Sequence, residues 1–511
     1  MGNACGNLED YWQAIESTNF FCGGAIWDWI DQAMYNYTPE GWKYPAYGGD
    51  FGDKPNDGQF VMNGIVFADR TPKPQYYEVI KVYQHIDVKA VDAEKGVFEV
   101  FNKRYFTDLS DVRLRWRTFA DGHPTGEGFL PLGKVGPRAR VRVQLPDLPL
   151  DPARENFVNF EFVQAEDLPW AGRGYTVARD QFLLNAAAPK PAPQPGEPVR
   201  LQTAGTRVTL SGKGFEAVFD RETGTLAALR YNGIPVLSEG PKLNAFRAFT
   251  NNDNWFYESW FEHGLHNLRH RVLSSDVRTA EDGSVVLTFR VESQAPCGAK
   301  IHGGTASGRN SVEELTDKPF GPDDFKFTTV QTWTVRPDGS VELSADIDSN
   351  KPDLILPRLG YLMRVPAGLS EFTYYGRGPV GNYPDRKSGQ FIGLYRNTVD
   401  GEFVPFPKPQ DAGNHEDVRW CALTDRSGLG LKAVADGTMS ASVSRWSALD
   451  LTLAGHIHEL PRPGDTYLRL DLGVTGLGGN SCGQGGPLQK DCVTAGLHRF
   501  GFTLRPAVPV W

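Results

Sequence analysis

The chain has 511 residues, more than one ordinary domain holds, and its 56 glycines and 36 prolines favour many turns and a largely β-structured protein. A net charge of −9 and a pI near 5.7, without any basic stripe, argue against nucleic acid or an anionic membrane as a partner. No run of about 18 apolar residues predicts a transmembrane helix, and none of the six cysteines forms a CxxC pair of the structural-zinc type.

The first 86 residues combine short regular elements with one long irregular segment. The pattern of residues 1–20 predicts a helix, that of 23–30 a strand, and that of 74–86 a second helix. Residues 32–75 are rich in Gly, Asp and Asn and predict a loop, and loops this long are usually functional. Such a segment cannot bury a core alone, so we expect an incomplete part of a larger domain.

Residues 87–188 change to short strands with alternating apolar side chains, which predicts an immunoglobulin-like β-sandwich. Residues 189–199 are rich in proline and predict an extended linker that ends this domain. The strand-like runs within the sandwich are 96–106, 112–120, 138–146 and 157–165.

Residues 200–511 predict a second, larger all-β domain. They contain no short repeat of the propeller or solenoid kind, so a large double-sheet sandwich is the natural architecture. The strand-like runs are 206–212, 215–220, 284–293, 327–336, 340–348, 466–474 and 498–507.

Residues 23–70 concentrate Trp, Tyr, Gly, Asp and Asn, a composition that favours a sugar-binding surface. Aromatic faces stack on the C–H patches of a sugar ring, and short polar side chains bind its hydroxyl groups. A retaining glycosidase also needs two carboxyl groups about 5–5.5 Å apart. Nothing marks a carboxylate of this stretch as catalytic, so we interpret its aspartates as structural: Asp28, Asp31, Asp50, Asp53, Asp57 and Asp69.

Two long motifs within residues 23–74, GGAIWDWIDQ and YGGDFGDKPNDGQFVMNGIVFADRTPKP, resemble glycoside hydrolase family 2, and within it the LacZ-type β-galactosidases. YGRGPVGNYPDR (375–386) and GLGGN (476–480) are similar to motifs of the same subgroup. The resemblance implies a mainly β chain with the C-terminal end of a (β/α)₈ barrel, an immunoglobulin-like sandwich and a large galactose-mutarotase-like sandwich. It also implies a retaining hydrolysis of terminal non-reducing β-D-galactose residues in β-galactosides.

In that family the nucleophilic glutamate lies in a segment resembling Glu-Tyr-x-His-Ala-Met-Gly-Asn, and this chain opens with Met1, Gly2 and Asn3. The resemblance therefore implies that the nucleophile and the acid/base glutamate both precede Met1. We expect no catalytic residue in this chain and no hydrolysis by the chain alone. The implied partners are a β-galactoside, the missing N-terminal portion of the same enzyme and further copies in a homo-oligomer, in the cytoplasm or the periplasm.

The resemblance also implies binding positions. Trp27 would pack against the sugar, while the Phe60 carbonyl and the Asn63 side chain would hold a Na⁺ ion that touches galactose. Asn56 would lie near the catalytic Mg²⁺ and act through water. Mg²⁺ and Na⁺ are thus the implied cofactors of the complete enzyme, and we expect neither to bind this chain alone tightly.

Three further residues are candidate substrate contacts by resemblance. Asn252 and Asp253 lie in TNNDNW, which is similar to a segment that approaches the active site in the family. Cys482 stands near the place of an aromatic platform for the second sugar. A thiol cannot stack as an aromatic ring does, so a preference for lactose is in doubt.

Two alternatives stay open. Another family 2 activity, such as that of a β-glucuronidase or β-mannosidase, is disfavoured by the length of region 200–511. A non-catalytic carbohydrate-binding β-sandwich protein would account for the missing carboxylates but not for the active-site motifs.

Outside the motifs, His456 and His458 alternate as on one strand face, where a polar surface is favoured over a metal site because no third ligand is evident. His415 and Glu416 are expected in a turn before a strand, as surface or interface residues.

Overall fold

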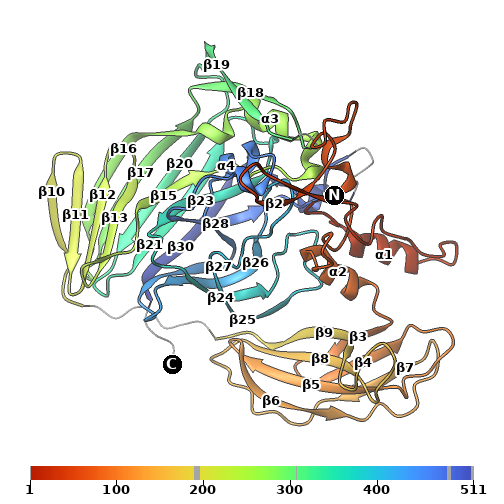
Figure 1. Ribbon diagram of the computed structural model, residues 1–511. Coiled ribbons are helices and arrows are strands. Elements are labelled where there is room, and N and C mark those ends of the chain that lie inside the picture. Colours follow the sequence, from red (N-terminus) through yellow and green to blue (C-terminus); the bar gives the residue numbers. More distant parts are fainter. Residues whose placement is uncertain (1, 189–195, 306–307, 480–484, 508–511) are drawn as a thin grey trace. The chain divides into compact units, whose positions relative to one another are not determined.

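The computed structural model describes residues 2–188, 196–305, 308–479 and 485–507, which form two compact units (Figure 1). The larger unit comprises Met1–Tyr76, Gln194–Lys387 and Tyr395–Trp511, and the smaller one Tyr77–Pro193 and Ser388–Leu394. Antiparallel strands dominate both units, so the predicted mainly β fold class is confirmed. Most of the predicted linker, residues 189–195, lies outside the described residues. Among the helices of the described ranges, none is both long and apolar enough to cross a membrane.

The smaller unit is a two-sheet sandwich, as its sequence predicts. Phe98 and Phe160 meet in its core with ring centroids 4.8 Å apart. Burial alternates along the strands because successive side chains point to opposite faces of a sheet. One sheet has the order β3 (Ile86–Asp92), β4 (Val97–Asn102) and β7 (Arg140–Gln144); the other has the order β6 (His123–Leu130), β5 (Val112–Ala120), β8 (Asn156–Gln164) and β9 (Thr176–Asn185).

The larger unit packs a five-stranded sheet and a twelve-stranded sheet around one shared core, in which Phe219 contacts Trp333. The predicted large sandwich is therefore confirmed. The smaller sheet runs β10 (Arg200–Ala204), β11 (Arg207–Gly212), β12 (Phe215–Asp220), β13 (Thr225–Tyr231) and β14 (Ile234–Pro235).

The long strands of the twelve-stranded sheet lie side by side in Figure 1. Their order is β15 (Glu239–Asn244), β23 (Arg358–Val365), β28 (Thr466–Val474), β27 (Gly430–Ser444), β30 (His498–Ala507), β21 (Val341–Ser349), β20 (Phe327–Val335), β17 (Val285–Gln294) and β16 (Arg269–Thr279). Off this path are β24 (Glu371–Gly378), β25 (Phe391–Thr398) and β26 (His415–Thr424). Two further pairs are β18 (Cys297–His302) with β19 (Ser311–Pro319), and β22 (Ile355–Leu356) with β29 (Val493–Thr494).

The N-terminal region differs from its prediction in two places. The predicted strand at 23–30 is wrong: only Ile30 makes a single bridge, to Val66, and no ladder forms. The predicted loop 32–75 contains a hairpin of β1 (Met34–Tyr37) and β2 (Lys43–Ala46), whose strands are too short to show a periodic pattern. The predicted helices are present as α1 (Leu8–Glu16) and α2 (Pro74–Val82), with the 3₁₀ turn η1 (Gly58–Val61) between them.

Contacts with the large sandwich hold the N-terminal region in place. The Asn3 side chain donates a hydrogen bond to the Asp411 carbonyl (2.9 Å), and the Asn7 N–H donates to the Asp385 carbonyl (2.7 Å). The Gln59 side chain donates to the Thr305 carbonyl. Because these contacts join residues several hundred positions apart, residues 1–76 fold together with the sandwich as one unit.

Candidate functional site

Trp27 projects from an irregular segment, and 80% of its side chain is exposed. The neighbouring backbone is nevertheless well held. The Asp28 N–H donates to the Asn63 carbonyl (2.9 Å), and the Ile65 N–H donates to the Asp28 carbonyl (3.0 Å). These bonds bring the segment of Trp27 beside that of Asn63, so two predicted binding residues lie on adjacent stretches of backbone.

Phe60 and Asn63 lie together at the end of η1. The Asn63 amide nitrogen donates to the Phe60 carbonyl oxygen at 2.6 Å, and the Phe60 ring is 43% exposed. Carbonyl and amide oxygens are the donors that a hard cation prefers. Rotating the Asn63 amide by half a turn, which leaves its heavy-atom positions nearly unchanged, presents two oxygens side by side. In the structure the amide nitrogen faces the carbonyl, so Na⁺ ligation by this pair stays a prediction.

Asn56 stabilises a turn in the same loop. Its side-chain nitrogen donates to the Asp53 carbonyl (2.9 Å), and its side-chain oxygen accepts from the Gly58 N–H (3.0 Å). An amide oxygen has a second lone pair, so a water-mediated contact with Mg²⁺ stays a prediction for this residue.

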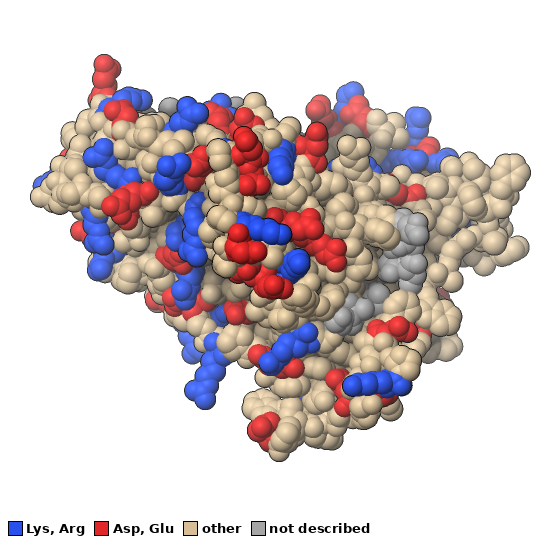
Figure 2. Space-filling model, turned by 90° about the horizontal axis from the view of Figure 1, so that it is seen from above, with Lys and Arg blue, Asp and Glu red and all other residues tan. Residues whose placement is uncertain are grey.

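Ten large hydrophobic side chains are exposed between residues 20 and 60, in what we call the aromatic segment. Exposed apolar groups at this density mark a surface that another chain or a ligand covers. Figure 2 shows acidic and basic side chains intermixed on one face of the molecule, so charge on that face does not indicate a polyanionic ligand. The ten side chains are Phe20, Phe21, Trp27, Trp29, Met34, Tyr35, Tyr37, Trp42, Phe51 and Phe60.

Asp31 is a structural carboxylate, as predicted. It is 4% exposed, and one oxygen accepts from Lys73 Nζ (2.6 Å) and from the Gly64 N–H (2.8 Å). Burial raises the pKa of Asp31 although Lys73 opposes this, and burial lowers the pKa of Lys73. Lys73 was not singled out in the sequence, where TPKP signals only the start of a helix.

The segment TNNDNW forms η2 (Asn251–Trp255), inside the large unit. Asp253 is 1% exposed; one oxygen accepts from Arg247 (2.7 Å) and the other from the Thr250 N–H (2.7 Å). This arrangement leaves Asp253 no free access to a sugar hydroxyl. The Asn252 side chain donates to the Gly478 carbonyl (3.1 Å), and its buried oxygen has no partner among the described residues. Cys482 lies outside the described residues.

Two histidine predictions are wrong. His415 and Glu416 begin strand β26 and are buried; His415 Nε2 lies 2.8 Å from Glu402, and the His415 ring packs against the Tyr374 ring at 4.2 Å. His456 and His458 are not in a strand: His458 lies in the 3₁₀ turn η4 (Ile457–Glu459), which follows α4 (Ala448–Leu453), and His456 immediately precedes that turn.

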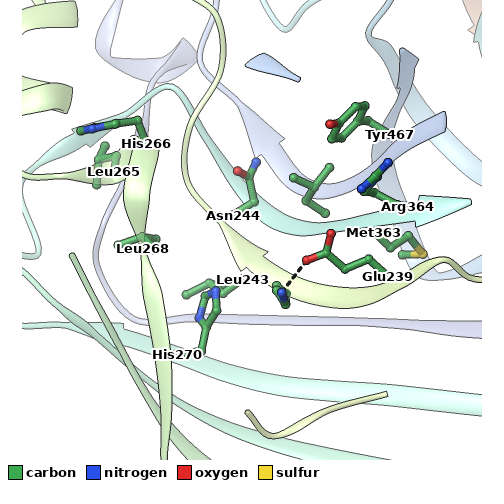
Figure 3. Close-up of a pocket in the computed structure, with 12 residues that line it drawn as sticks. Glu239, Leu243, Asn244, Leu265, His266, Leu268, His270, Met363, Arg364 and Tyr467 are labelled. Atoms are coloured by element: carbon green, nitrogen blue, oxygen red, sulfur yellow. Dashed lines mark hydrogen bonds and ion pairs between the residues drawn. The ribbon is translucent and has the colours of Figure 1, made fainter. Parts of the chain in front are cut away.

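A cavity of about 230 Å³ opens beside β15 (Figure 3), and its lining includes none of the predicted binding residues. Glu239 and Lys242 form an ion pair within it, and His270 and Arg364 also line it. Burial lowers the pKa of His270 to about 4, so this imidazole is neutral at pH 7. The cavity is thus a feature separate from the Trp27 region.

Three family models together match most of the chain. The model described as "Beta galactosidase small chain" matches residues 211–504. "Glycosyl hydrolases family 2, TIM barrel domain" matches residues 1–88, and "Beta-galactosidase, domain 4" matches residues 98–185.

Curated relatives agree with these models. A β-galactosidase of Priestia megaterium is 31% identical over 95% of this chain and 44% of its own length. A β-galactosidase of Vibrio cholerae is 31% identical over 99% of this chain and 47% of its own length. The chain therefore spans about half the length of the curated relatives that it matches. Among solved structures, a putative aldose 1-epimerase of Escherichia coli K12 aligns with 59% of this chain and 98% of its own, at 11% identity and a TM-score of 0.31.

Proposed function

Because the chain belongs to glycoside hydrolase family 2, in its LacZ-type β-galactosidase subgroup, we propose that it acts as part of a retaining β-galactosidase. The proposed substrates are β-galactosides with a terminal non-reducing galactose. The observation that carries this proposal is the exposed Trp27 beside the paired Phe60 carbonyl and Asn63 amide. An aromatic face and a polar pair on adjacent segments match what binding one face and one hydroxyl edge of a sugar requires.

The proposed chemistry needs two carboxyl groups, and we infer that the described residues near Trp27 do not supply them. Retention requires a nucleophile and an acid/base about 5–5.5 Å apart. Within the described part of residues 23–70, five aspartates accept hydrogen bonds from nearby backbone N–H groups and are engaged in loop structure: Asp28, Asp31, Asp50, Asp53 and Asp69. We therefore propose that both catalytic glutamates come from polypeptide outside these 511 residues.

The aromatic segment supports the same proposal. Its exposed rings suit contact with the remaining strands and helices of a (β/α)₈ barrel, whose interior and helix layer are packed with apolar side chains. The proposed partner is thus the rest of the catalytic barrel, and the proposed role of the large sandwich is to hold residues 1–76 in a shape that this barrel can join.

Cations complete the proposed site. Phe60 and Asn63 would hold Na⁺ through a carbonyl and an amide oxygen, and the ion would fix a substrate hydroxyl by electrostatic attraction. Asn56 would contact Mg²⁺ only through water, because its amide already bonds to the loop backbone on both sides. We assign no direct Mg²⁺ ligand among the described residues.

The test is reconstitution with the N-terminal half of a relative, such as the β-galactosidase of Priestia megaterium. The chain alone should not hydrolyse o-nitrophenyl β-D-galactoside, and the mixture should. In the mixture, Trp27→Ala should lower kcat/KM by roughly 10- to 100-fold, because an aromatic contact and its buried area are lost.

Trp170→Ala is the matched control, since this tryptophan is 64% exposed on the smaller unit. It should leave kcat/KM unchanged. If the Trp27 and Trp170 variants have equal activity, Trp27 does not contact the sugar. Galactose binding by the chain alone, with no activity in any mixture, would favour the non-catalytic binding protein instead.

A further inference from the structure

His456 and His458 lie in a compact cluster with Glu459, outside the galactoside site. The two imidazole centroids are 5.3 Å apart with ring planes at 22°. Each of the three residues offers a potential metal-ligand atom, and these atoms all lie within 4.8 Å of one another. The third ligand that the sequence did not reveal is thus Glu459, on the same 3₁₀ turn.

The loop after β2 fixes His456 in place. The Tyr47 ring stacks on the His456 ring at 4.6 Å with planes 7° apart, and the Tyr47 hydroxyl donates to the Gly455 carbonyl. The Tyr44 ring packs against both imidazoles, at 5.0 Å from His456 and 4.7 Å from His458. Only 10% of the His456 side chain is exposed, so its ring has little freedom to turn.

His456 lies between two carboxylates. Its Nε2 is 3.0 Å from Asp50 Oδ2, and its Nδ1 is 3.5 Å from Glu459 Oε1. When Nε2 donates its hydrogen to Asp50, a neutral ring turns the Nδ1 lone pair toward Glu459. Two acceptors then face each other, and a cation between them makes the contact favourable. That cation is either a proton on Nδ1 or a metal ion.

The spacing of this nitrogen and oxygen is compatible with a metal ion. Zinc bonds of about 2.1 Å in a tetrahedral site hold neighbouring ligand atoms roughly 3.4 Å apart, close to the observed 3.5 Å. The other oxygen of Glu459 accepts from the Gly455 N–H (2.8 Å) and from Arg309 Nε (3.1 Å), which orients this carboxylate. A metal-binding histidine also commonly donates its second ring N–H to a carboxylate, the position that Asp50 occupies here.

We propose that His456 Nδ1, His458 and Glu459 bind a divalent transition-metal ion of the Zn²⁺ class, with Asp50 as the positioning residue for His456. Two imidazoles and one carboxylate form a donor set that zinc accepts, with water in the fourth position. The ion would fasten β2, which holds Tyr44, and the following loop, which holds Tyr47 and Asp50, to the turn at 456–459, about four hundred residues away in sequence. This cluster shares no proposed ligand with the galactoside site, although Asp50 lies in the same loop as Asn56.

Zinc titration of the untagged, metal-free full chain by isothermal calorimetry tests the proposal. We expect one Zn²⁺ per chain at this site, no comparable binding of Mg²⁺, and a Co²⁺ derivative with the intense visible bands of a tetrahedral site. His458→Ala should abolish this binding. Asp50→Asn, which retains all three ligands, should weaken it about 10- to 100-fold.

His302→Ala is the matched control, because His302 pairs with Glu313 on the exposed hairpin of β18 and β19 and is outside the cluster. It should leave zinc binding unchanged. Circular dichroism checks the fold of each variant, and Glu459→Gln replaces His458→Ala if the latter misfolds. Zinc binding that is absent from the wild type, or unchanged in both Asp50→Asn and the ligand variant, would overturn the metal site.

Discussion

At the scale of single residues, the motifs at 375–386 and 476–480 meet inside the large unit. Asp385 accepts hydrogen bonds from the N–H groups of Leu477 (3.0 Å) and Gly478 (2.7 Å). Arg386, 2% exposed, donates to the Asn3 side chain (2.6 Å). These motifs therefore stabilise the fold, because they join three segments that are distant in sequence.

Buried charge gives this unit a pH dependence at Asp471. The residue is fully buried beside Arg358, with one oxygen 3.0 Å from Arg358 Nη1 and the other without a hydrogen-bond partner among the described residues. Burial raises the pKa of Asp471 to about 6, although Arg358 opposes the shift. The folded state thus binds this proton more tightly than the unfolded chain does, whose usual pKa for aspartate is about 3.9.

We therefore expect the stability that Asp471 contributes to be fully present below about pH 4 and to be lost as the pH rises through about 6. Urea unfolding of the wild type and of Asp471→Asn between pH 4 and pH 7 measures this. The difference in unfolding free energy, wild type minus variant, should fall across that range. Parallel profiles for the two proteins would contradict the raised pKa.

At the scale of elements, α2 is joined to a distant segment of the smaller unit through Glu78. This buried carboxylate accepts from the Ser388 N–H (3.2 Å), the Ser388 hydroxyl (2.7 Å) and the Gly389 N–H (2.8 Å). Three donors on one carboxylate make Glu78 the main polar link between the helix and residues 388–389.

Glu78→Ala should lower the unfolding free energy of the smaller unit by about 1–3 kcal/mol, because buried backbone N–H groups lose this acceptor. Glu78→Gln retains one acceptor oxygen and should therefore lower the unfolding free energy by less than Glu78→Ala does. Chemical denaturation followed by circular dichroism gives both values. If both variants unfold like the wild type, the link contributes nothing to stability.

At the scale of the whole molecule, each of the two units has its own large hydrophobic core among the described residues. Phe160 belongs to the core of the smaller unit and Trp333 to that of the larger one, and no described residue belongs to both clusters. Since each core is complete within its own unit, we expect two unfolding transitions rather than one.

Phe160→Ala should lower the unfolding free energy of the smaller unit only, and Trp333→Ala that of the larger unit only. We expect a decrease of about 3–5 kcal/mol in each case. Calorimetry with hydrogen-exchange mapping assigns each transition, and each variant serves as the control for the other. A single transition that both variants shift equally would mean that the units unfold together.

Much of this molecule was predictable from local patterns. The predicted strands at 112–120, 215–220, 466–474 and 498–507 match β5, β12, β28 and β30 residue for residue. They could be predicted because the alternation of apolar and polar residues along a half-buried strand is a local sequence pattern. The family resemblance is confirmed by models that match residues 1–88, 98–185 and 211–504. The contact of Phe60 with Asn63 is equally local, since the residues are three positions apart.

The sequence by itself therefore determined the family, the mainly β fold class and the order of the two sandwiches. Only the tertiary structure decided which polar residues are buried and with what: Asp253 with Arg247, Asp31 with Lys73, and His456 with Asp50. It also decided that residues 23–30 form no strand. The physical reason is that a strand or helix pattern reports on neighbouring positions, whereas burial, ion pairing and backbone partners depend on segments up to four hundred residues away.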